Sequence, residues 1–565
     1  MNNPLHSFKK QGLIVSQEKA FQASSSSVIG EASADNGDGL WVGKIADKVL
    51  AEFPDQGLYT CAAGISPSGI VHFGNFRDVA TSYAVVCELR ARGKKARFLF
   101  SWDNYDRFRK VPVGVDPSFS RYIGMPLTSV PDPEGQFPSY ARRFETEFEE
   151  SMKELGITLD YRYQTQEYQS GRYTDKIAFA LQNRAQAAEI QLQFKTDKCN
   201  QEKGIDPETF RQTYFPVTVY SRFSGTDKVQ VLSYDGGTKL TYRCLMTDKV
   251  EQIDFRETPV VKLPWKLDWA MRWGEEQVHF EPSGKDHMTP GGSFDVNAAF
   301  AREMFGRKPP VPQMYEFVGI QGVKGGKMSG SKGGAISPAM LLEIYEPTLL
   351  KWLYMRRSPM QSFNLAFDTE VYRQYDEFDR EVASFQRGEA SPARQKILQF
   401  SGVTQTDPAP LAFKQAVALG QITQWQPEKL RELAEKSEIP CSAASIAARL
   451  PKAQAWLTRY NPEEIIALRD GPNADYAAGL DDKRRAQIAA LSAFLKGDVT
   501  SIPALDETLY SIPKDPALTD KETKVAQRGF FKDVYNLLIG KDAGPRLSTF
   551  LWAIDRTKVL ALLAI

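Results

Sequence analysis

The fold is indicated most clearly by "LYTCAAGISPSGIVHFGNFRDVATSYAVVCELRARG" at residues 58–93, followed by "ARFLFSWDN" at 96–104. Residues 58–63 form an apolar run that predicts a buried strand, and 75–92 have the pattern of a helix that ends at Gly93. The run at 96–104 predicts the next buried strand. A strand, a glycine-containing turn, a helix and a strand predict a right-handed βαβ unit. The sequence therefore indicates an α/β fold in which 64–75 lie at the carboxyl edge of a parallel sheet, where ligands bind.

The turn "GISPSGIVHFGN" at 64–75 has two interpretations. Gly69 and Gly74 permit close backbone approach, and the N-terminus of the following helix favours an anion. His72 would then donate to a phosphate oxygen that gains charge in a transition state. In the other interpretation the stretch is a connection in which His72 caps a backbone group. Taken alone, the stretch favours neither.

A second loop, "GGKMSGSKGG" at 325–334, is rich in glycine, lysine and serine. Lys327 and Lys332 would clamp a polyphosphate, and Ser329 and Ser331 would add hydrogen bonds. The loop lacks the G-x-x-x-x-G-K-[ST] pattern of a P-loop. The alternative is a solvated surface loop.

A third stretch, "EPSGKDHMTPGGS" at 281–293, lies between a predicted strand and a predicted helix. Asp286 would accept from a ribose hydroxyl and His287 would face the site. The alternative is a connection with a helix N-cap at Ser293. All three stretches are expected at the same edge of one sheet, so together they favour a nucleotide site.

The spacing of apolar residues and the positions of turn residues also predict the remaining helices and strands. Helices are expected at 40–53, 140–155, 170–194 and 294–306, strands at 277–281 and 314–322, and a small antiparallel insertion from about 210 to 260. The remainder is expected to be mainly helical, with connections near 402–410 and 500–520.

Composition limits the class of protein. The chain has 565 residues, of which 42% are hydrophobic, and its 71 basic and 70 acidic residues give a net charge of +1. A nucleic-acid partner is neither indicated nor excluded, because a basic face fits within a neutral total. The five cysteines show no CxxC pair, which indicates a reducing compartment. No apolar run approaches the roughly 20 residues of a membrane helix, and no secretory signal is visible. We therefore expect a cytoplasmic protein.

Two of these motifs resemble those of a known enzyme class. "HFGN" at 72–75 and "KMSGS" at 327–331 resemble, in this order, the His-Ile-Gly-His and Lys-Met-Ser-Lys-Ser motifs of class I aminoacyl-tRNA synthetases. From about residue 40 to the C-terminus the chain is similar to the class I lysyl-tRNA synthetase family. The segments that carry this similarity are "SWDNYDRFRKVP" at 101–112, "PWKLDWAMRW" at 264–273, "SGKDHMTPGGS" at 283–293, "YEPTLLKWLYMRR" at 345–357, "YDEFDR" at 375–380 and "GPRL" at 544–547.

The resemblance implies a Rossmann-type parallel-sheet catalytic domain with a small connective insertion, followed by an all-α helix cage that binds the anticodon. The expected divisions are a loose N-terminal extension (1–40), the first catalytic half (41–165), the insertion (166–262), the second catalytic half (263–335), a stem-contact segment (336–385) and the anticodon-binding domain (386–565).

The resemblance also implies the reaction. Lysine and ATP would give lysyl-adenylate and pyrophosphate, and the lysyl group would pass to the 2′-hydroxyl of the terminal adenosine of tRNA-Lys. The lysine carboxylate attacks the α-phosphate, so no protein nucleophile is needed, and Mg²⁺ would neutralise the ATP phosphates. The expected catalytic residues are His72, Asn75, Lys327, Ser329 and Lys332, and the expected ATP-binding residues are Gly74, Gly284, Asp286, Lys327, Met328 and Ser331.

This sequence departs from the family pattern in three places. Asn75 stands where the class has a second histidine, and Gly330 stands where it has a second lysine. The positive charge of that second lysine must then come from Lys327 or Lys332. Some archaeal members carry a cysteine-rich zinc site in the insertion, where this chain has only Cys199 and Cys244. We predict no structural zinc.

The pocket for a lysine side chain needs a carboxylate or aromatic faces for the ammonium group. The candidates are Gly64, Ser66, Asp103, Trp269, Trp273 and His287. Each has an ordinary alternative. The tryptophans at 265, 269 and 273 recur as on a core helix face. Asp103 and Asp106 would then pair with arginines 107 and 109.

The expected partners are lysine, ATP and tRNA-Lys, with no membrane and with the chain as a monomer. The alternative functions are another class I synthetase of the glutamyl type, a synthetase-like RNA-binding protein that charges no tRNA, and a nucleotidyltransferase with another acceptor. The first would share the helical cage, and the last would not need the final 180 or so residues.

Overall fold

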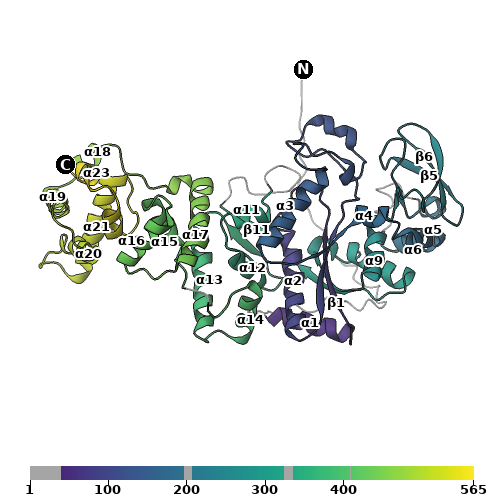
Figure 1. The fold of residues 1–565 in the computed structure, drawn as a ribbon, viewed down its shortest axis with the longest axis horizontal. Coiled ribbons are helices and arrows are strands. Elements are labelled where there is room, and N and C mark those ends of the chain that lie inside the picture. The colour runs from purple at the N-terminus through teal and green to yellow at the C-terminus, as the bar shows by residue number, and fades with distance from the viewer. Residues whose placement is uncertain (1–39, 196–205, 323–334, 407–408) are drawn as a thin grey trace, which may run out of the picture. The chain divides into compact units, whose positions relative to one another are not determined.

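The central sheet has five parallel strands in the order β10-β9-β1-β2-β3. The computed structural model describes residues 40–195, 206–322, 335–406 and 409–565. The strands are β1 (Tyr59–Ile65), β2 (Ala96–Trp102), β3 (Asp160–Tyr163), β9 (Val278–Gly284) and β10 (Val311–Tyr315). The predicted α/β fold is confirmed (Figure 1).

Side chains of the central strands alternate between two hydrophobic cores, as the two-residue period of a strand requires. In β1, Cys61 and Ala63 enter one core, whereas Ala62 enters the other. In β2, Phe98 and Phe100 enter the first core and Leu99 the second. A strand buried on both faces is an unbroken apolar run, which is why β1 and β2 stand out in the sequence.

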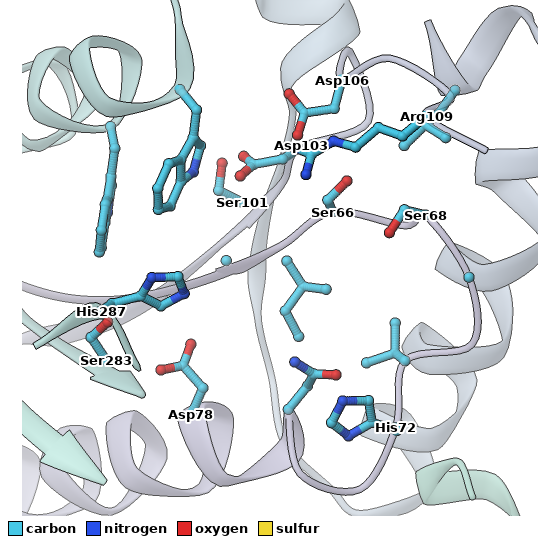
Figure 2. Close-up of a pocket in the computed structure, with 18 of the residues that line it drawn as sticks. Ser66, Ser68, His72, Asp78, Ser101, Asp103, Asp106, Arg109, Ser283 and His287 are labelled. Atoms are coloured by element: carbon cyan, nitrogen blue, oxygen red, sulfur yellow. The ribbon is translucent and has the colours of Figure 1, made fainter. Parts of the chain in front are cut away.

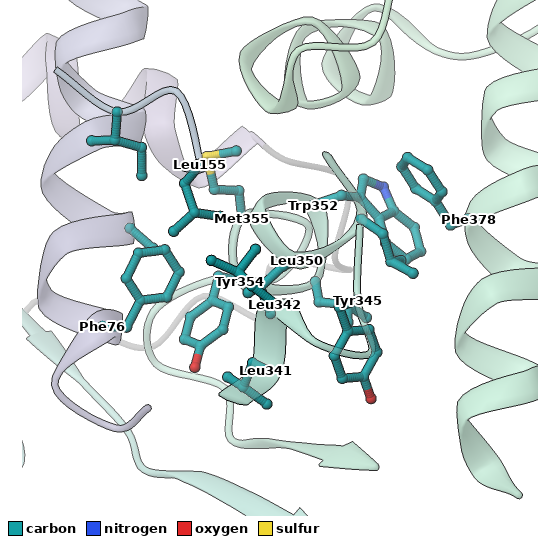
Figure 3. Packing of buried hydrophobic residues seen from close by; sticks show 14 of the residues in the cluster. Phe76, Leu155, Leu341, Leu342, Tyr345, Leu350, Trp352, Tyr354, Met355 and Phe378 are labelled. Atoms are coloured by element: carbon teal, nitrogen blue, oxygen red, sulfur yellow. The ribbon is translucent and has the colours of Figure 1, made fainter. Parts of the chain in front are cut away.

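Helices on the first face of the sheet pack tightly against one another. They are α1 (Leu40–Glu52), α2 (Phe76–Ala91), α3 (Tyr140–Glu154), α11 (Pro338–Leu342) and α12 (Pro347–Met355). Figure 3 shows Leu350, Tyr354 and Met355 of α12 beside Phe76 of α2 and Leu155. The phenol of Tyr354 also donates to the carbonyl of Phe73, 2.7 Å away, so α12 braces the turn that follows β1.

The second face of the sheet is covered by helices and by the insertion. The helices are α4 (Gln164–Gln169), α5 (Thr174–Gln182), α6 (Arg184–Gln193), α8 (Pro207–Thr213), α9 (Trp265–Glu275) and α10 (Ser293–Ala299). The predicted antiparallel insertion is confirmed as β5 (Val229–Tyr234), β6 (Lys239–Cys244) and β7 (Val250–Asp254), in that order in one sheet. Beside it, β4 (Thr218–Val219) pairs with β8 (Val261–Lys262).

The C-terminal region is mainly helical, as predicted (green to yellow in Figure 1). Its helices are α13 (Glu370–Gln386), α14 (Pro392–Ser401), α15 (Phe413–Ile422), α16 (Pro427–Lys436), α17 (Ala443–Ala455), α18 (Ala474–Ala478), α19 (Asp482–Lys496), α20 (Ile502–Ser511), α21 (Asp520–Ile539), α22 (Leu547–Ala553) and α23 (Arg556–Leu562). The first core continues through α13 to α17, and a third core forms among helices α18 to α23. The first core crosses residue 386, so the domain divisions stay predictions.

Two predicted elements are each divided in the structure. The helix expected at 170–194 is two helices, α5 and α6, because Asn183, where they meet, has non-helical dihedral angles (φ −103°, ψ 26°). The strand expected at 314–322 is also two elements, the end of β10 and β11 (Val318–Gln321). The backbone N–H of Glu316 donates to Pro359 (2.8 Å), so the chain leaves the central sheet there.

Two elements in the C-terminal half were missed. The strand β12 (Phe363–Ala366) pairs in parallel with β11, a partner distant in sequence that local patterns do not reveal. Helix α20 lies where a connection was expected, near 500–520. Its signal was present, because Ser501 caps the helix by accepting from the N–H of Ala504. The helix expected at 294–306 changes from α to π geometry at Phe300.

Within the described ranges, no helix is long and apolar enough to cross a membrane. The same residues contain no group of three or more His, Cys, Asp or Glu side chains that could hold a metal ion. Cys61, Cys87, Cys244 and Cys441 are free thiols, and Cys199 lies outside the described residues.

Candidate active site

A cavity of about 630 Å³ opens at the carboxyl edge of the central sheet. Its walls come from the turn after β1, from the ends of β2, β9 and β10, and from α2 and α9. From β1 the strand order continues to β2 and β3 on one side and to β9 and β10 on the other. Parallel sheets form ligand crevices at such a switch point. Figure 2 shows polar side chains from these separate segments directed toward one space.

The His72 turn combines both predicted interpretations. The Nδ1 atom of His72 accepts from the backbone N–H of Gly74 at 3.0 Å, so the ring does cap a backbone group. This bond leaves the remaining ring proton on Nε2, the other side of the imidazole. Desolvation lowers the pKa of the half-buried His72 below its ordinary value. His72 is therefore a neutral hydrogen-bond donor at the cavity wall.

Gly74 is required for the position of that ring. A Cβ at residue 74 would lie 2.8 Å from Cε1 and 2.9 Å from Nδ1 of His72. Asn75 lines the cavity as the N-cap residue of α2, and its side chain makes no capping hydrogen bond. The side chain of Asn75 is thus available at a helix N-terminus, where donors and the helix dipole favour an anion.

The turn is also fixed to the segment that follows the second predicted loop. The N–H of Phe73 donates to the carbonyl of Ile336 at 2.8 Å. The predicted residues Lys327, Met328, Ser329, Ser331 and Lys332 lie outside the described residues. Ile336, which follows that loop in sequence, is the residue that the His72 turn contacts.

Two carboxylates in the cavity wall are neutralised by buried cations. Asp103 pairs with Arg272 (2.8 Å) and Asp106 pairs with Lys262 (2.7 Å). Burial opposes the charge of Arg272, yet Asp103 and Asp268 hold its pKa above the ordinary value. Burial acts to raise the pKa of Asp106, but Lys262 holds it below the ordinary value. Of the alternative pairing with arginines 107 and 109, the part that concerns Arg107 is wrong, since Arg107 pairs with Asp227. Arg109 is near enough to help to lower the pKa of Asp106.

Two other carboxyl groups in the wall, Asp78 and Glu281, form no ion pair with a described residue. Asp78 extends from the first turn of α2 into the cavity (Figure 2). Burial, reinforced by the proximity of Glu281, raises the pKa of Asp78 well above its ordinary value. Burial also raises the pKa of Glu281 to about 7, although Trp273 donates to it at 2.6 Å. Neither carboxyl group therefore has a cationic partner in a salt bridge among the described residues.

Aromatic rings cover the side of the cavity formed by α9. Trp265 and Trp269 are stacked 5.5 Å apart, half-buried, and both line the cavity. His287 lies 5.5 Å from Trp265 and faces the same space (Figure 2). Trp273 is buried in the second core and does not line the cavity, so here the core-face alternative is correct.

The other predicted residues divide into two groups. Gly64 and Ser66 line the cavity, and Gly64 permits the close approach of β1 to β2, since its Cβ would lie 3.1 Å from the carbonyl of Ser101. Gly284 and Asp286 do not line it. Asp286 is exposed in a short 3-10 helix, Lys285–His287, next to the cavity.

Sequence reasoning missed Asp78, Glu281 and Tyr315, all of which line the cavity. A signal existed for the first two. Glu281 interrupts the buried strand "VHFEPSG", and Asp78 lies in the buried first turn "FRDVA". An acid within a buried run is costly unless it is paired or functional. Tyr315 ends a strand and carried no such signal.

Comparison with known proteins agrees with this geometry. Residues 39–403 match the family model described as "tRNA synthetases class I (K)". A lysine–tRNA ligase of Streptomyces coelicolor is 37% identical to this chain, over 93% of this chain and 98% of that protein. The lysine–tRNA ligase of Pyrococcus horikoshii is 32% identical, over 92% and 98%, respectively.

Among solved structures, a glutamate tRNA ligase from Elizabethkingia meningosepticum aligns with 89% of this chain and 98% of its own. Its identity is 11% and its TM-score 0.42, a similarity too low to support a conclusion. The family model covers more than half of the chain, and the sequence relatives cover nearly all of it. The chain belongs to the class I tRNA synthetases of the lysine type, the family "tRNA synthetases class I (K)".

Proposed function

We propose that this protein is a lysine–tRNA ligase that activates lysine with ATP and transfers it to the 2′-hydroxyl of the terminal adenosine of tRNA-Lys. The observation that carries the proposal is that two buried carboxyls, Asp78 and Glu281, form no ion pair with a described residue and lie in the same cavity as the neutral donor His72. One end of this cavity suits an ammonium group, and the other end suits phosphates.

The lysine side chain is proposed to extend toward Asp78 and Glu281. Its ammonium supplies the positive charge that both carboxyls lack, and its methylene stem packs along Trp269. Asp103 is the less suitable counter-charge, because Arg272 already neutralises it. The proposal therefore moves the ammonium from the predicted Asp103 to Asp78 and Glu281. Gly64, Ser66 and His287 remain proposed walls for the rest of the amino acid.

ATP, as its Mg²⁺ complex, is proposed to lie along the His72 turn. His72 donates from Nε2, and Asn75 donates from the N-terminus of α2, to phosphate oxygens that gain charge during adenylate formation. Lys327, Ser329 and Lys332 are proposed to stabilise the departing pyrophosphate, and Met328 and Ser331 to contact ATP. Gly74 positions His72, while Gly284 and Asp286 are proposed to approach the adenosine.

The reaction then needs positioning and charge stabilisation without a protein nucleophile. The lysine carboxylate forms a bond to the α-phosphorus as the bond to the pyrophosphate oxygen breaks. Mg²⁺, as part of the ATP substrate complex, would neutralise the phosphates. In the second step the 2′-hydroxyl attacks the lysyl carbonyl and AMP leaves.

The remaining assignments follow from the same proposal. The helical region beyond residue 386 is proposed to bind the anticodon, the segment 336–385 to contact the tRNA stem, and 166–262 to form the connective insertion between the catalytic halves at 41–165 and 263–335. The protein is proposed to act as a monomer in the cytoplasm, without a structural zinc.

The glutamyl-type alternative is disfavoured by the charge of the cavity. A glutamate side chain would place a third carboxyl group beside Asp78 and Glu281, where the proximity of Glu281 already raises the pKa of Asp78. A lysine side chain relieves that repulsion instead.

An ATP–pyrophosphate exchange assay across the twenty amino acids tests the proposal. We expect exchange with lysine and with none of the other amino acids, and we expect the protein to charge tRNA-Lys. Exchange with glutamate instead of lysine would favour the alternative synthetase, and exchange with no amino acid would favour a protein that charges no tRNA. Full activity toward another acceptor after removal of the last 180 or so residues would favour a nucleotidyltransferase.

A further inference from the structure

Two turns of the insertion have the same backbone conformation. The first, at 221–226, lies between β4 and β5, and the second, at 244–249, leads from the last residue of β6 to β7. In each turn the N–H of the first residue donates to the carbonyl of the sixth, at 2.9 Å, and the N–H of the fifth donates to the carbonyl of the first. The fifth residue has a positive φ in both turns, 70° at Gly225 and 56° at Asp248. One turn conformation is therefore used twice in this small sheet.

Strand pairing brings the two turns together. Cys244 pairs with Val229 between β6 and β5, and the N–H of Leu245 donates to the carbonyl of Lys228 at 2.9 Å. The second turn therefore begins next to the segment that leaves the first. The first and fourth residues of the turns "SRFSGT" and "CLMTDK" are Ser221, Ser224, Cys244 and Thr247.

Three hydroxyl groups from these positions surround one sulfur atom. The Oγ atom of Ser224 lies 3.5 Å from the Sγ atom of the buried Cys244. The hydroxyls of Ser221 and Thr247 and the backbone N–H of Met246 also form hydrogen bonds to this sulfur. Desolvation acts to raise the pKa of the Cys244 thiol, but these hydrogen bonds lower it to about 6. The sulfur is thus an anion at neutral pH that hydrogen-bond donors stabilise.

The four positions have the spacing of a zinc site but not its donor atoms. Structural zinc sites often have two C-x-x-C pairs separated by roughly 15–20 residues. Here the pairs are S-x-x-S and C-x-x-T, and 19 residues, 225–243, separate them. Zinc takes thiolate, imidazole or carboxylate ligands, and Cys244 alone among the four supplies one. This donor set does not fit zinc.

The distance between the side chains agrees with this replacement. In a tetrahedral site with Zn–S bonds of about 2.3 Å, neighbouring sulfur atoms lie about 3.8 Å apart. The 3.5 Å between Oγ of Ser224 and Sγ of Cys244 is only slightly shorter. The hydroxyl therefore contacts the sulfur directly, from the position that a second thiolate would have around a metal.

We infer that the insertion has the paired turns of a zinc site, in which hydrogen bonds from Ser221, Ser224 and Thr247 to the sulfur of Cys244 replace the metal. Family members with a cysteine-rich zinc site carry it in the insertion, and this arrangement states what stands in its place here. The inference does not depend on lysine activation, because neither turn lines the active-site cavity.

The first test restores the missing thiols in the full chain. The restored variant has a cysteine at the first and fourth positions of both turns, through Ser221→Cys/Ser224→Cys/Thr247→Cys. The matched control adds three cysteines at exposed middle positions of the same turns, through Arg222→Cys/Phe223→Cys/Met246→Cys. Both variants and the wild type are purified under reducing conditions from medium that contains zinc. Bound zinc is measured by mass spectrometry of the metal, and the visible absorption of added Co²⁺ reports tetrahedral thiolate coordination.

We expect about one zinc ion per chain in the restored variant and none in the wild type or the control. Zinc should also raise the melting temperature of the restored variant, and a chelator should remove that gain. Three results would overturn the inference. They are a restored variant that folds but binds no zinc, equal zinc in the control, and a zinc ion in the wild type that Cys244→Ala removes.

A second test uses the native hydroxyls and decides the matter if the restored variant does not fold. Cys244→Ala removes the shared acceptor, so limited proteolysis should cleave the insertion roughly 10- to 150-fold faster, the factor that corresponds to one hydrogen bond to a charged group. Cys244→Ser keeps an acceptor and should show a smaller increase. Cys441→Ala, at a half-buried free thiol outside the insertion, should leave this cleavage unchanged. Unchanged cleavage in Cys244→Ala, or an equal increase in Cys244→Ser, would overturn the inference.

Discussion

The active-site cavity and the C-terminal helical region place their charges in opposite ways. In the active site, Asp78 and Glu281 are buried and lack a cation among the described residues, while Asp103 and Asp106 are paired. In the helical region the buried Arg449 is paired with Glu346 and Asp379, whereas Lys429 and Lys436 are exposed and form no ion pair with a described residue. We therefore expect a ligand to supply positive charge where a buried carboxyl group has no cationic partner among the described residues.

Each arrangement suits a different partner. A buried carboxyl discriminates strongly, because a ligand without a positive charge leaves it unpaired in a low dielectric. Exposed lysines attract any phosphate backbone weakly and respond to salt. The small amino acid would thus be selected by buried charge, and the large RNA by several weaker surface contacts.

The largest expected effect concerns Arg449, a buried arginine that does not line the active-site cavity. Arg449 is 2% exposed and joins α17 to Asp379 of α13 and to Glu346. Arg449→Ala should lower the free energy of unfolding by about 3–5 kcal/mol, because it leaves two carboxylates without their partner. Chemical denaturation of the variant and the wild type measures this difference in the free energy of unfolding.

Arg459→Ala is the control for that change, since Arg459 pairs with Glu343 but its side chain is 61% exposed. It should cost no more than about 1 kcal/mol. Equal losses in the two variants would remove the distinction between buried and exposed charge.

The next effect concerns the unpaired buried carboxyls. Asp78→Asn or Glu281→Gln should weaken activation of lysine, measured as kcat/KM in the exchange assay, by about 2–5 kcal/mol. The amides keep the shape of the site and remove the charge that the ammonium needs. Glu275→Gln is the control, because Glu275 is an acid of the same region that pairs with Lys176 at the surface. Normal lysine activation in both site variants would contradict the assignment.

A comparable effect is expected at His72. His72→Ala should cost about 2.7–4 kcal/mol, mostly in kcat, if Nε2 donates to charge that develops in the transition state. Gly74→Ala sharpens the test because it retains the imidazole and displaces it, since the new Cβ would lie 2.8 Å from Cε1. A loss in both variants indicates that ring position matters, whereas a normal rate in His72→Ala would refute the role.

The smallest effect is a dependence on pH. The pKa of Glu281 is raised to about 7, so the carboxyl is protonated below that pH and cannot pair with the ammonium. KM for lysine should therefore fall about tenfold as pH rises from roughly 6 to 8. Glu281→Gln should lose this dependence. A wild-type KM that does not change across this range would show that Glu281 does not titrate on lysine binding.

The sequence predicted the catalytic half of the fold better than the C-terminal half. The strands β1 and β2 are buried on both faces, so their apolar runs are visible without any partner. The strand β12 pairs with β11, which is distant in sequence, and α5 and α6 are separated by one residue with non-helical dihedral angles, Asn183. The pattern of apolar residues detects a strand that is buried on both faces. It does not detect a strand that depends on a distant partner or a helix break at one residue.

The sequence by itself determined the parallel α/β core, the His72 turn and the family, because these reside in local runs and ordered motifs. Only the tertiary structure decided that Arg272 neutralises Asp103, that Trp273 belongs to the core, and that Asp78 and Glu281 lack a cation among the described residues. The physical reason is that the state of a charge depends on its neighbours in space. Those neighbours come from segments up to about 200 residues apart, as Asp78 and Glu281 do.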